Sequence, residues 1–225
     1  MIMARFSRID VAVKFREAGI IPLFFHKEQD ICRSAIKACY EGGSRVFEFT
    51  NRGDFAHELF SDINKWAEKE IPEMIMGVGS VVDAGTASLY IQLGANFIVS
   101  PVLNPDVAKV CNRRKILWMP GCGSASEISY AEELGAEIIK VFPGKSVGGP
   151  DFIKNMKGPC PWTSLMPTGG VEPTRENLKA WFDAGAICVG MGSNIITKEI
   201  VQKKDWKLLS SNMAEALKIA GEVKK

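Results

Sequence analysis

Histidine, long apolar runs and an excess of charge of either sign are all scarce or missing in this chain of 225 residues. Its two histidines, His26 and His57, do not have the spacing of zinc ligands, so we expect no metal site. No apolar run approaches the roughly 18 residues that a membrane-spanning helix needs. The formal net charge is only +2, which argues against nucleic acid or a membrane surface as a partner.

Paired cysteines are also absent, because none of the six cysteines forms a Cys-x-x-Cys motif. The N-terminal residues include the charged Arg5, Arg8 and Asp10, and so differ from the apolar core of a signal peptide. We therefore expect reduced thiols and a cytoplasmic protein. Cys122 follows a predicted strand. It is either an ordinary partly buried thiol, which we favour, or a reactive one.

What the sequence does contain is a regular alternation of short apolar runs and amphipathic segments. Hydrophobic residues make up 46% of the chain and charged residues 24%, as in an ordinary globular protein. The apolar runs have few polar residues on either face, which is typical of parallel strands covered on both sides. These predicted strands are residues 20–25, 46–50, 74–79, 97–101, 117–121, 138–143, 165–169 and 187–190. The predicted helices are residues 29–40, 55–68, 84–93, 105–111, 125–134, 152–156, 176–184 and 206–219.

This alternation predicts an α/β fold, a (β/α)8 TIM barrel, because eight strand–helix units in about 200–250 residues match that architecture. An amphipathic lead-in helix is expected at about residues 8–18, before a barrel at about 20–222. No linker or low-complexity segment divides the chain, so we expect residues 1–225 to form a single domain. The alternative is an open doubly wound sheet, which eight evenly spaced units favour less than a closed one.

Lys140 is the most informative residue, because it lies within a strand-like apolar run at residues 137–143. Burial of an ammonium is costly and favours the neutral amine. A neutral amine can attack a carbonyl and form a Schiff base. The alternative is a lysine at the end of a strand whose side chain extends to water. The local pattern favours neither interpretation.

A second charged side chain within a predicted strand is Glu48. Alternation along residues 46–53 places Glu48, Thr50 and Arg52 on one face. Burial raises the pKa of a carboxyl group, and a raised pKa suits a group that takes and returns a proton. The alternative is a buried Glu48–Arg52 ion pair with a purely structural role.

Glycine-rich segments follow three of the predicted strands. Gly77-Val78-Gly79-Ser80 lacks the third glycine of a dinucleotide fingerprint, and it is either a carboxylate site or a plain tight turn. The last two strands end in Thr168-Gly169-Gly170 and Gly192-Ser193, and the second is expected to open a short helix. Backbone N–H groups and a helix N-terminus at these positions form a phosphate cradle in many barrels. A pair of tight turns is the alternative.

Taken together, these segments resemble the family of 2-keto-3-deoxy-6-phosphogluconate (KDPG) and 4-hydroxy-2-oxoglutarate (KHG) aldolases. The resemblance extends over about residues 20–196 and includes the segment at 97–105. Its most specific parts are Glu48-x-Thr50-x-Arg52, Lys140-Val141-Phe142-Pro143 and Pro167-Thr168-Gly169-Gly170. It implies a class I aldolase, a lyase, that cleaves KDPG to pyruvate and glyceraldehyde 3-phosphate, and also KHG to pyruvate and glyoxylate.

The resemblance also implies a role for each matching residue. Lys140 would form the Schiff base, Glu48 would be the acid/base group, and Arg52 would bind the carboxylate of the keto acid substrate. The other substrate-binding residues would be Ser80, Pro101, Phe142, Thr168, Gly169, Gly170, Gly192 and Ser193. No cofactor is implied, because the iminium does the work of a metal Lewis acid. A homotrimer is implied as well.

Some positions depart from the family pattern. Ser80 stands where threonine is common, and the common Thr-Leu-Arg-Thr segment is Thr50-Asn51-Arg52-Gly53 here. The segment at residues 120–125 also differs. These changes spare Lys140, Glu48 and Arg52, so they bear on the choice of keto acid rather than on the reaction class. Two other classes stay open, a different phosphate-binding barrel enzyme such as a sugar-phosphate epimerase, and a non-catalytic ligand-binding barrel.

Overall fold

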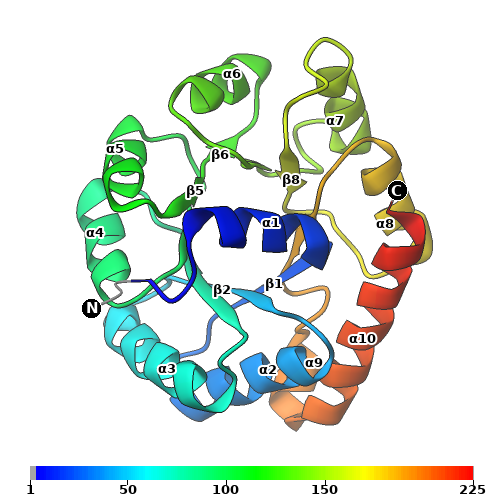
Figure 1. Ribbon diagram of the computed structural model, residues 1–225. Helices are drawn as coiled ribbons and strands as arrows, with labels where there is room; N and C mark the ends of the chain where they lie inside the picture. The colour runs from blue at the N-terminus through cyan, green and yellow to red at the C-terminus, as the bar shows by residue number, and fades with distance from the viewer. Residues whose placement is uncertain (1–3, 225) are drawn as a thin grey trace.

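The computed structural model describes residues 4–224, and it places a ring of helices around a set of short strands (Figure 1). The strands are β1 (Ile20–Phe24), β2 (Val46–Thr50), β3 (Ile75–Gly79), β4 (Phe97–Val99), β5 (Leu117–Met119), β6 (Gly121–Cys122), β7 (Ile139–Val141), β8 (Leu165–Pro167) and β9 (Val189–Met191). The helices are α1 (Arg8–Ala18), α2 (Gln29–Glu41), α3 (Ala56–Glu70), α4 (Ala84–Gln92), α5 (Pro105–Arg114), α6 (Ala125–Glu133), α7 (Gly149–Lys157), α8 (Arg175–Asp183), α9 (Lys198–Lys203) and α10 (Trp206–Val223).

All paired strands are parallel, as the two-sided apolar runs predict. They form a six-stranded sheet in the order β5-β4-β3-β2-β1-β9 and a three-stranded sheet in the order β6-β7-β8. The predicted α/β fold with parallel strands is therefore confirmed. The predicted (β/α)8 barrel is not seen as one closed sheet, because the strand pairing is divided between these two sheets.

Two features explain this division of the ladder. Pro120 separates β5 from β6 and has no N–H to donate, although its carbonyl oxygen accepts a bond from the Lys140 N–H at 3.0 Å. Between β8 and β9 the pairing is reduced to a single bridge, from Thr168 to Gly190. One further hydrogen bond, from the Ile187 N–H to the Leu165 carbonyl at 3.0 Å, joins the same two segments.

Helix α1 lies across one end of the strands (Figure 1). Its Val11 and Phe15 are fully buried among side chains from the strands, such as Val46, Phe97 and Leu117. The rings of Phe15 and Phe97 meet edge to face, with centroids 4.8 Å apart. Because the apolar face of α1 is buried against these side chains, the helix fills this end of the strand ring.

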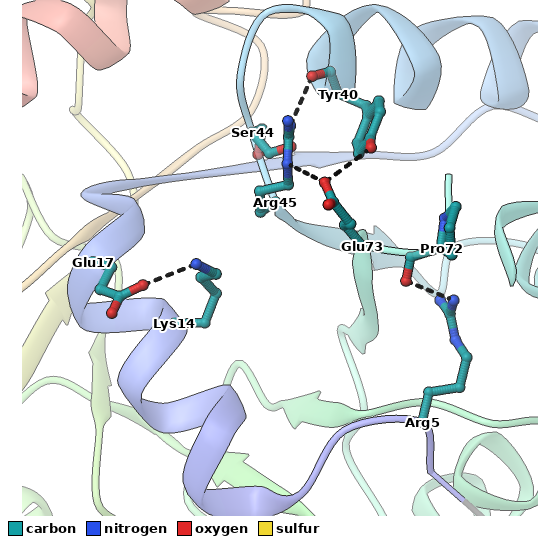
Figure 2. A network of polar contacts seen from close by, with 8 residues as sticks. All are labelled: Arg5, Lys14, Glu17, Tyr40, Ser44, Arg45, Pro72 and Glu73. Carbon is teal, nitrogen blue, oxygen red and sulfur yellow. Dashed lines mark hydrogen bonds and ion pairs between the residues drawn. The ribbon is translucent and has the colours of Figure 1, made fainter. Parts of the chain in front are cut away.

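Polar contacts secure the same end of the molecule, as Figure 2 shows around Arg45, the residue before β2. The Arg45 guanidinium lies over the Tyr40 ring at 4.1 Å and forms an ion pair of 3.2 Å with Glu73. The Tyr40 hydroxyl donates to Glu73 at 3.1 Å. Arg5 donates to the Pro72 carbonyl at 3.1 Å. These contacts join α2, β2 and the segment before β3 at the amino ends of the strands.

Side-chain caps begin several of the helices that lead away from the opposite edge of the strands. Asp83 caps α4 by accepting from the Thr86 N–H, and Ser124 caps α6 in the same way through the Glu127 N–H. Thr174 caps α8. Each cap satisfies one of the free N–H groups of a first turn, so it stabilises the start of its helix. None of the helices within residues 4–224 is both long and apolar enough to cross a membrane.

Candidate active site

Lys140 is the central residue of β7 and is buried, with only 7% of its side chain exposed. Its Nζ lies 4.0 Å from Oε1 of Glu48, whose side chain is 2% exposed. The Lys140 side chain therefore does not extend to water, which removes the alternative that the local pattern left open. Its Nζ also lies 5.0 Å from the centre of the Phe142 ring. A buried amine thus faces a buried carboxyl group across the interior of the strands.

The Glu48 carboxyl group has few compensating contacts. Its Oε2 is buried and has no hydrogen-bond partner among residues 4–224. Burial raises the pKa of Glu48, and the charges of Lys140 and Arg52 oppose part of that rise. An unpartnered buried oxygen is costly, so this group is poised to exchange a proton or to accept a bond from a ligand. The ion pair observed is with Lys140, whereas the alternative predicted from the sequence was with Arg52.

A glycine on the neighbouring strand makes room for the Glu48 side chain. Gly79 of β3 pairs with Thr50 of β2, two residues beyond Glu48. A Cβ at Gly79 would lie 1.7 Å from Glu48 Oε1 and 2.4 Å from its carboxyl carbon. No side chain fits at that distance, so Gly79 is required for the position of the carboxyl group. The Gly77–Ser80 segment is thus a strand end built around Glu48.

A cavity of about 540 Å³ opens beside this pair, at the carboxyl ends of β1, β2, β7, β8 and β9. Its volume is within the range of small-molecule sites. The predicted residues that line it are Arg52, Phe142, Thr168, Gly169, Gly170, Gly192 and Ser193. Lys140 and Glu48 are not among the lining residues, but each lies two residues before one of them, Phe142 and Thr50. The pair therefore lies behind the cavity wall, with Lys140 Nζ 5.0 Å from the ring centre of the lining residue Phe142.

Two predicted site residues lie elsewhere. Ser80 follows β3 with a left-handed φ of 63°, and Pro101 follows β4. Neither lines the cavity. In the sheet order, β2 lies between β1 and the strands β3 and β4. Ser80 and Pro101, which follow β3 and β4, therefore lie further around the ring than the cavity wall.

The loop after β8 has the conformation that its glycines allow. Gly170 has φ +80°, and a Cβ there would lie 2.4 Å from the Cβ of Lys145. Asn177 of α8 donates to the Gly170 carbonyl at 3.2 Å, and Asn194 donates to the Val171 carbonyl at 2.6 Å. These contacts hold the loop against α8 and the segment after β9.

The segment after β9 differs from its prediction. Gly192 and Ser193 do not open a helix. Instead, the Gly192 carbonyl accepts from the N–H groups of Ile195 and Ile196, both at 3.0 Å, in a turn. Helix α9 begins only at Lys198. An anion near Ser193 would therefore meet loop amides and the serine hydroxyl rather than a helix N-terminus.

The Thr168 hydroxyl is a further unsatisfied group in the wall of the cavity. Its Oγ1 is buried and has no partner among residues 4–224. Gly190 of β9 makes space for it, because a Cβ at Gly190 would lie 2.3 Å from this oxygen. As with Glu48, a glycine on the adjacent strand admits a polar side chain that remains free to bind a ligand.

Sequence reasoning missed several lining residues, chiefly Phe24 at the end of β1, Phe25 and His26 after it, and Lys198 and Gln202 of α9. The polar residue His26 directly after the predicted apolar strand at residues 20–25 was a signal that pointed to the functional edge.

Burial raises the pKa of Cys122 to about 12, so its thiol stays protonated. The predicted ordinary buried thiol is therefore favoured over a reactive one. No group of three or more potential metal ligands occurs within residues 4–224.

Comparison with known proteins identifies the class to which this fold and site belong. Residues 11–211 match the family model for "KDPG and KHG aldolase". The 2-dehydro-3-deoxy-phosphogluconate aldolase of Pseudomonas aeruginosa is 34% identical over 213 residues, which cover 94% of this chain and 92% of the relative. The chain therefore belongs to the KDPG and KHG aldolase family, and the class of protein is a carbon–carbon lyase.

Two solved structures of aldolases support the same assignment. The KDPG aldolase of Legionella pneumophila, with pyruvate captured as a covalent carbinolamine, has a TM-score of 0.81 at 25% identity and covers 90% of this chain and 96% of its own. The Zymomonas mobilis enzyme, solved with 3-phosphoglycerate, has a TM-score of 0.81 at 26% identity and covers 93% of this chain and 96% of its own. At least nine-tenths of this chain therefore shares its fold with these two enzymes.

Proposed function

We propose that this protein is a class I aldolase that cleaves KDPG to pyruvate and glyceraldehyde 3-phosphate, and that also cleaves KHG to pyruvate and glyoxylate. The observation that carries the proposal is the buried Lys140 Nζ, 4.0 Å from Glu48 Oε1 and next to the cavity. Membership of the aldolase family supports the same reaction. A sugar-phosphate epimerase would have no use for an amine at this place.

Imine formation comes first. The neutral amine of Lys140 attacks the C2 ketone of the keto acid, and a proton passes from nitrogen to oxygen to give a carbinolamine. Glu48, whose pKa burial raises, gives its proton to the leaving hydroxyl. Water departs and a protonated imine remains, with Glu48 as the carboxylate. A positively charged imine is an effective electron sink.

Carbon–carbon cleavage uses the same two groups. The Glu48 carboxylate removes the proton of the C4 hydroxyl, the C3–C4 bond breaks, and its electron pair moves into the iminium. The aldehyde leaves, and the enamine of pyruvate stays on Lys140. Glu48 then returns the proton to C3. Water hydrolyses the resulting protonated imine to pyruvate and the free amine, and the Glu48 carboxylate takes up the proton that this step frees. General acid–base groups of this kind contribute about 10²–10⁴-fold to rates.

The cavity wall supplies binding and orientation. Arg52 is suited to hold the substrate carboxylate through two hydrogen bonds, which places the ketone beside Lys140. The Phe142 ring packs beside the imine. We place the phosphate against the Gly169–Gly170 loop and Ser193, with Thr168 and Gly192 beside it. Ser80 and Pro101 are proposed to act from the neighbouring strand ends, outside the cavity lining.

Three wider features belong to the proposal. The two sheets act as one eight-stranded barrel in a single domain, since Pro120 alone separates β5 from β6 and the Thr168–Gly190 bridge joins β8 to β9. The active form is a homotrimer, which rests on the family resemblance and is testable by light scattering. A cytoplasmic location fits the six free cysteines.

Borohydride trapping tests the proposed function. Reduction in the presence of pyruvate should add one pyruvate-derived mass per chain, on a peptide that contains Lys140. Lys140→Ala should abolish the label. Lys145→Ala, which removes an exposed lysine close in sequence, should leave it unchanged. Labelling that persists in Lys140→Ala would identify a different nucleophile, and an unlabelled native protein would exclude the Schiff-base reaction.

A further inference from the structure

One histidine in the wall of the active-site cavity has no role in the proposed reaction. His26 lies two residues after the end of β1, at the carboxyl edge of the strands, and lines the cavity together with Ser193, Gly169 and Gly170. It is half-buried. A polar side chain on a loop at the functional edge of a barrel is a candidate for substrate recognition.

The backbone of His26 is held by Cys32 of α2. The His26 N–H donates to Cys32 Sγ at 3.2 Å, and the thiol donates to the His26 carbonyl at 3.0 Å. Burial raises the pKa of Cys32 to about 11, so the thiol keeps the proton that this second bond needs. The loop after β1 is thereby tied to the first turn of α2.

The imidazole ring is held separately. The Glu28 N–H donates to His26 Nδ1 at 3.0 Å, and the ring stacks on Phe24 with centroids 6.4 Å apart and planes 12° from parallel. Since Nδ1 accepts a bond, the proton of the neutral ring is assigned to Nε2. Within residues 4–224, Nε2 has no hydrogen-bond partner. The ring is therefore a fixed donor whose N–H is free for a ligand.

A cation borders the same cavity. Lys198, the first residue of α9, lines it and forms no ion pair with any residue of the described stretch. By contrast, Lys203 at the other end of α9 is paired with Glu199 at 2.6 Å. Loop amides and a serine hydroxyl donate hydrogen bonds but carry no net charge, so they leave the charge of a phosphate group uncompensated. Lys198 is placed to supply it.

We propose that His26 and Lys198 are specificity-determining residues, which bind the anionic distal group of the substrate and select phosphorylated over unphosphorylated aldehydes. His26 donates from Nε2 to a phosphate oxygen, and Lys198 supplies the opposing charge. This inference rests on the proposed function. It extends the phosphate site from the glycine loops to the loop after β1 and to α9.

The test is the aldol addition of pyruvate to two aldehydes that differ only in phosphate, glyceraldehyde 3-phosphate and glyceraldehyde. His26→Phe keeps an aromatic ring against Phe24 and removes the donor. The kcat/KM for the phosphorylated aldehyde should fall about ten- to a hundredfold, the range of a hydrogen bond to a charged group. The value for glyceraldehyde should change less than about twofold. Lys198→Met should have the same selective effect, and added salt should reduce it.

Two variants serve as matched controls. His57→Phe makes the same replacement on α3, and Lys203→Met makes it on α9, both outside the cavity. Neither should change the preference for the phosphorylated aldehyde. His26→Gln, which keeps a side-chain N–H, should restore part of the loss seen with His26→Phe.

Equal losses on both aldehydes, or no loss on either, would overturn the inference. If His26→Phe does not fold, the exposed Lys198→Met decides the question by the same criterion. Borohydride trapping with pyruvate involves no distal group, so it separates this inference from the proposed function. If the His26 and Lys198 variants are labelled normally but keep the native preference for the phosphorylated aldehyde, this inference alone is wrong. If the native protein is not labelled, the proposed function is wrong.

Discussion

The hydroxyl of Tyr90 on α4 donates a 2.8 Å hydrogen bond to Oδ1 of Asn51, the residue before Arg52. Tyr90 is fully buried, and burial raises its pKa to about 12, so the phenol is a donor at every working pH. The Asn51 N–H in turn donates to the Gly79 carbonyl at 2.9 Å. The Arg52 guanidinium forms no hydrogen bond or ion pair within residues 4–224, so its position depends on the backbone that Asn51 anchors.

Tyr90→Phe should therefore weaken binding of the substrate carboxylate. A neutral hydrogen bond contributes about 0.5–1.5 kcal/mol, so KM should rise about two- to tenfold while kcat changes little. Steady-state kinetics on KDPG measures both. Tyr40→Phe is the control, because it removes a hydroxyl bonded to Glu73 at the opposite end of the strands (Figure 2). A fall in kcat with an unchanged KM would show that Tyr90 acts on the chemistry or on folding instead.

Glu48→Gln should lower kcat by about 10²–10⁴-fold, because the amide keeps the size of the side chain but cannot carry a proton. The imine with pyruvate should still form, more slowly, and remain trappable by borohydride. Rapid quench and mass spectrometry separate the two steps. Near-normal turnover would reduce Glu48 to a structural partner of Lys140.

The raised pKa of Glu48 also predicts how stability varies with pH. A carboxyl group whose pKa is higher in the folded state binds more protons there, so its contribution to stability is full below the unfolded value of 4.5 and is lost as pH rises through the folded pKa. Glu48→Gln does not titrate. The melting temperature of this variant, relative to the native protein, should therefore improve as pH rises from about 4 toward neutrality. A constant difference over that range would mean that Glu48 titrates normally.

The glycine loop offers a prediction about phosphate. Ser193→Ala should reduce kcat/KM for KDPG about ten- to a hundredfold, with a smaller effect on KHG, which has a carboxylate in place of the phosphate tail. Gly170→Ala should do more, because its φ of +80° and the 2.4 Å approach to Lys145 force the loop to move. Gly221→Ala is the control, since a Cβ there meets nothing within 4 Å. Equal losses on both substrates would assign the loop a general supporting role.

Chelation tests whether a metal takes part. Activity should survive prolonged EDTA treatment, because the protonated imine on Lys140 supplies the electrophile that a metal ion would otherwise provide. Activity should be compared before and after dialysis, with and without added divalent ions. A loss that Mg²⁺, Mn²⁺ or Zn²⁺ restores would place the protein in a metal-dependent class.

Much of the fold was accessible from the sequence because its strands are buried on both faces. Strand β2, for example, occupies residues 46–50, as the apolar run predicts. The break in strand pairing at Pro120 could not be predicted, because the apolar run at residues 117–121 continues through this residue. The short helix expected directly after Gly192-Ser193 begins only at Lys198, and its start could not be predicted because six residues are too few to show a helical period.

The site was predictable where a charged residue lies within an apolar strand. Lys140 and Glu48 stand out because charges are costly in apolar runs, and the structure brings them together. His26 and Lys198 were missed because they come from opposite ends of the chain and line one cavity only because β1 pairs with β9. Ser80 and Pro101 lie outside the cavity lining for a related reason, because the sequence does not reveal which neighbouring strand ends form the wall.

Helix α1 has a practical consequence for anyone who wishes to attach this protein to a surface or to fuse it with another. Its Val11 and Phe15 close the amino ends of the strands, and Arg8 is fastened to Glu137 and to Asn112, whereas the cavity opens at the carboxyl ends. A tether joined ahead of Ala4 would leave from the closed end. The entrance would then point away from the support, and substrate would reach it unobstructed.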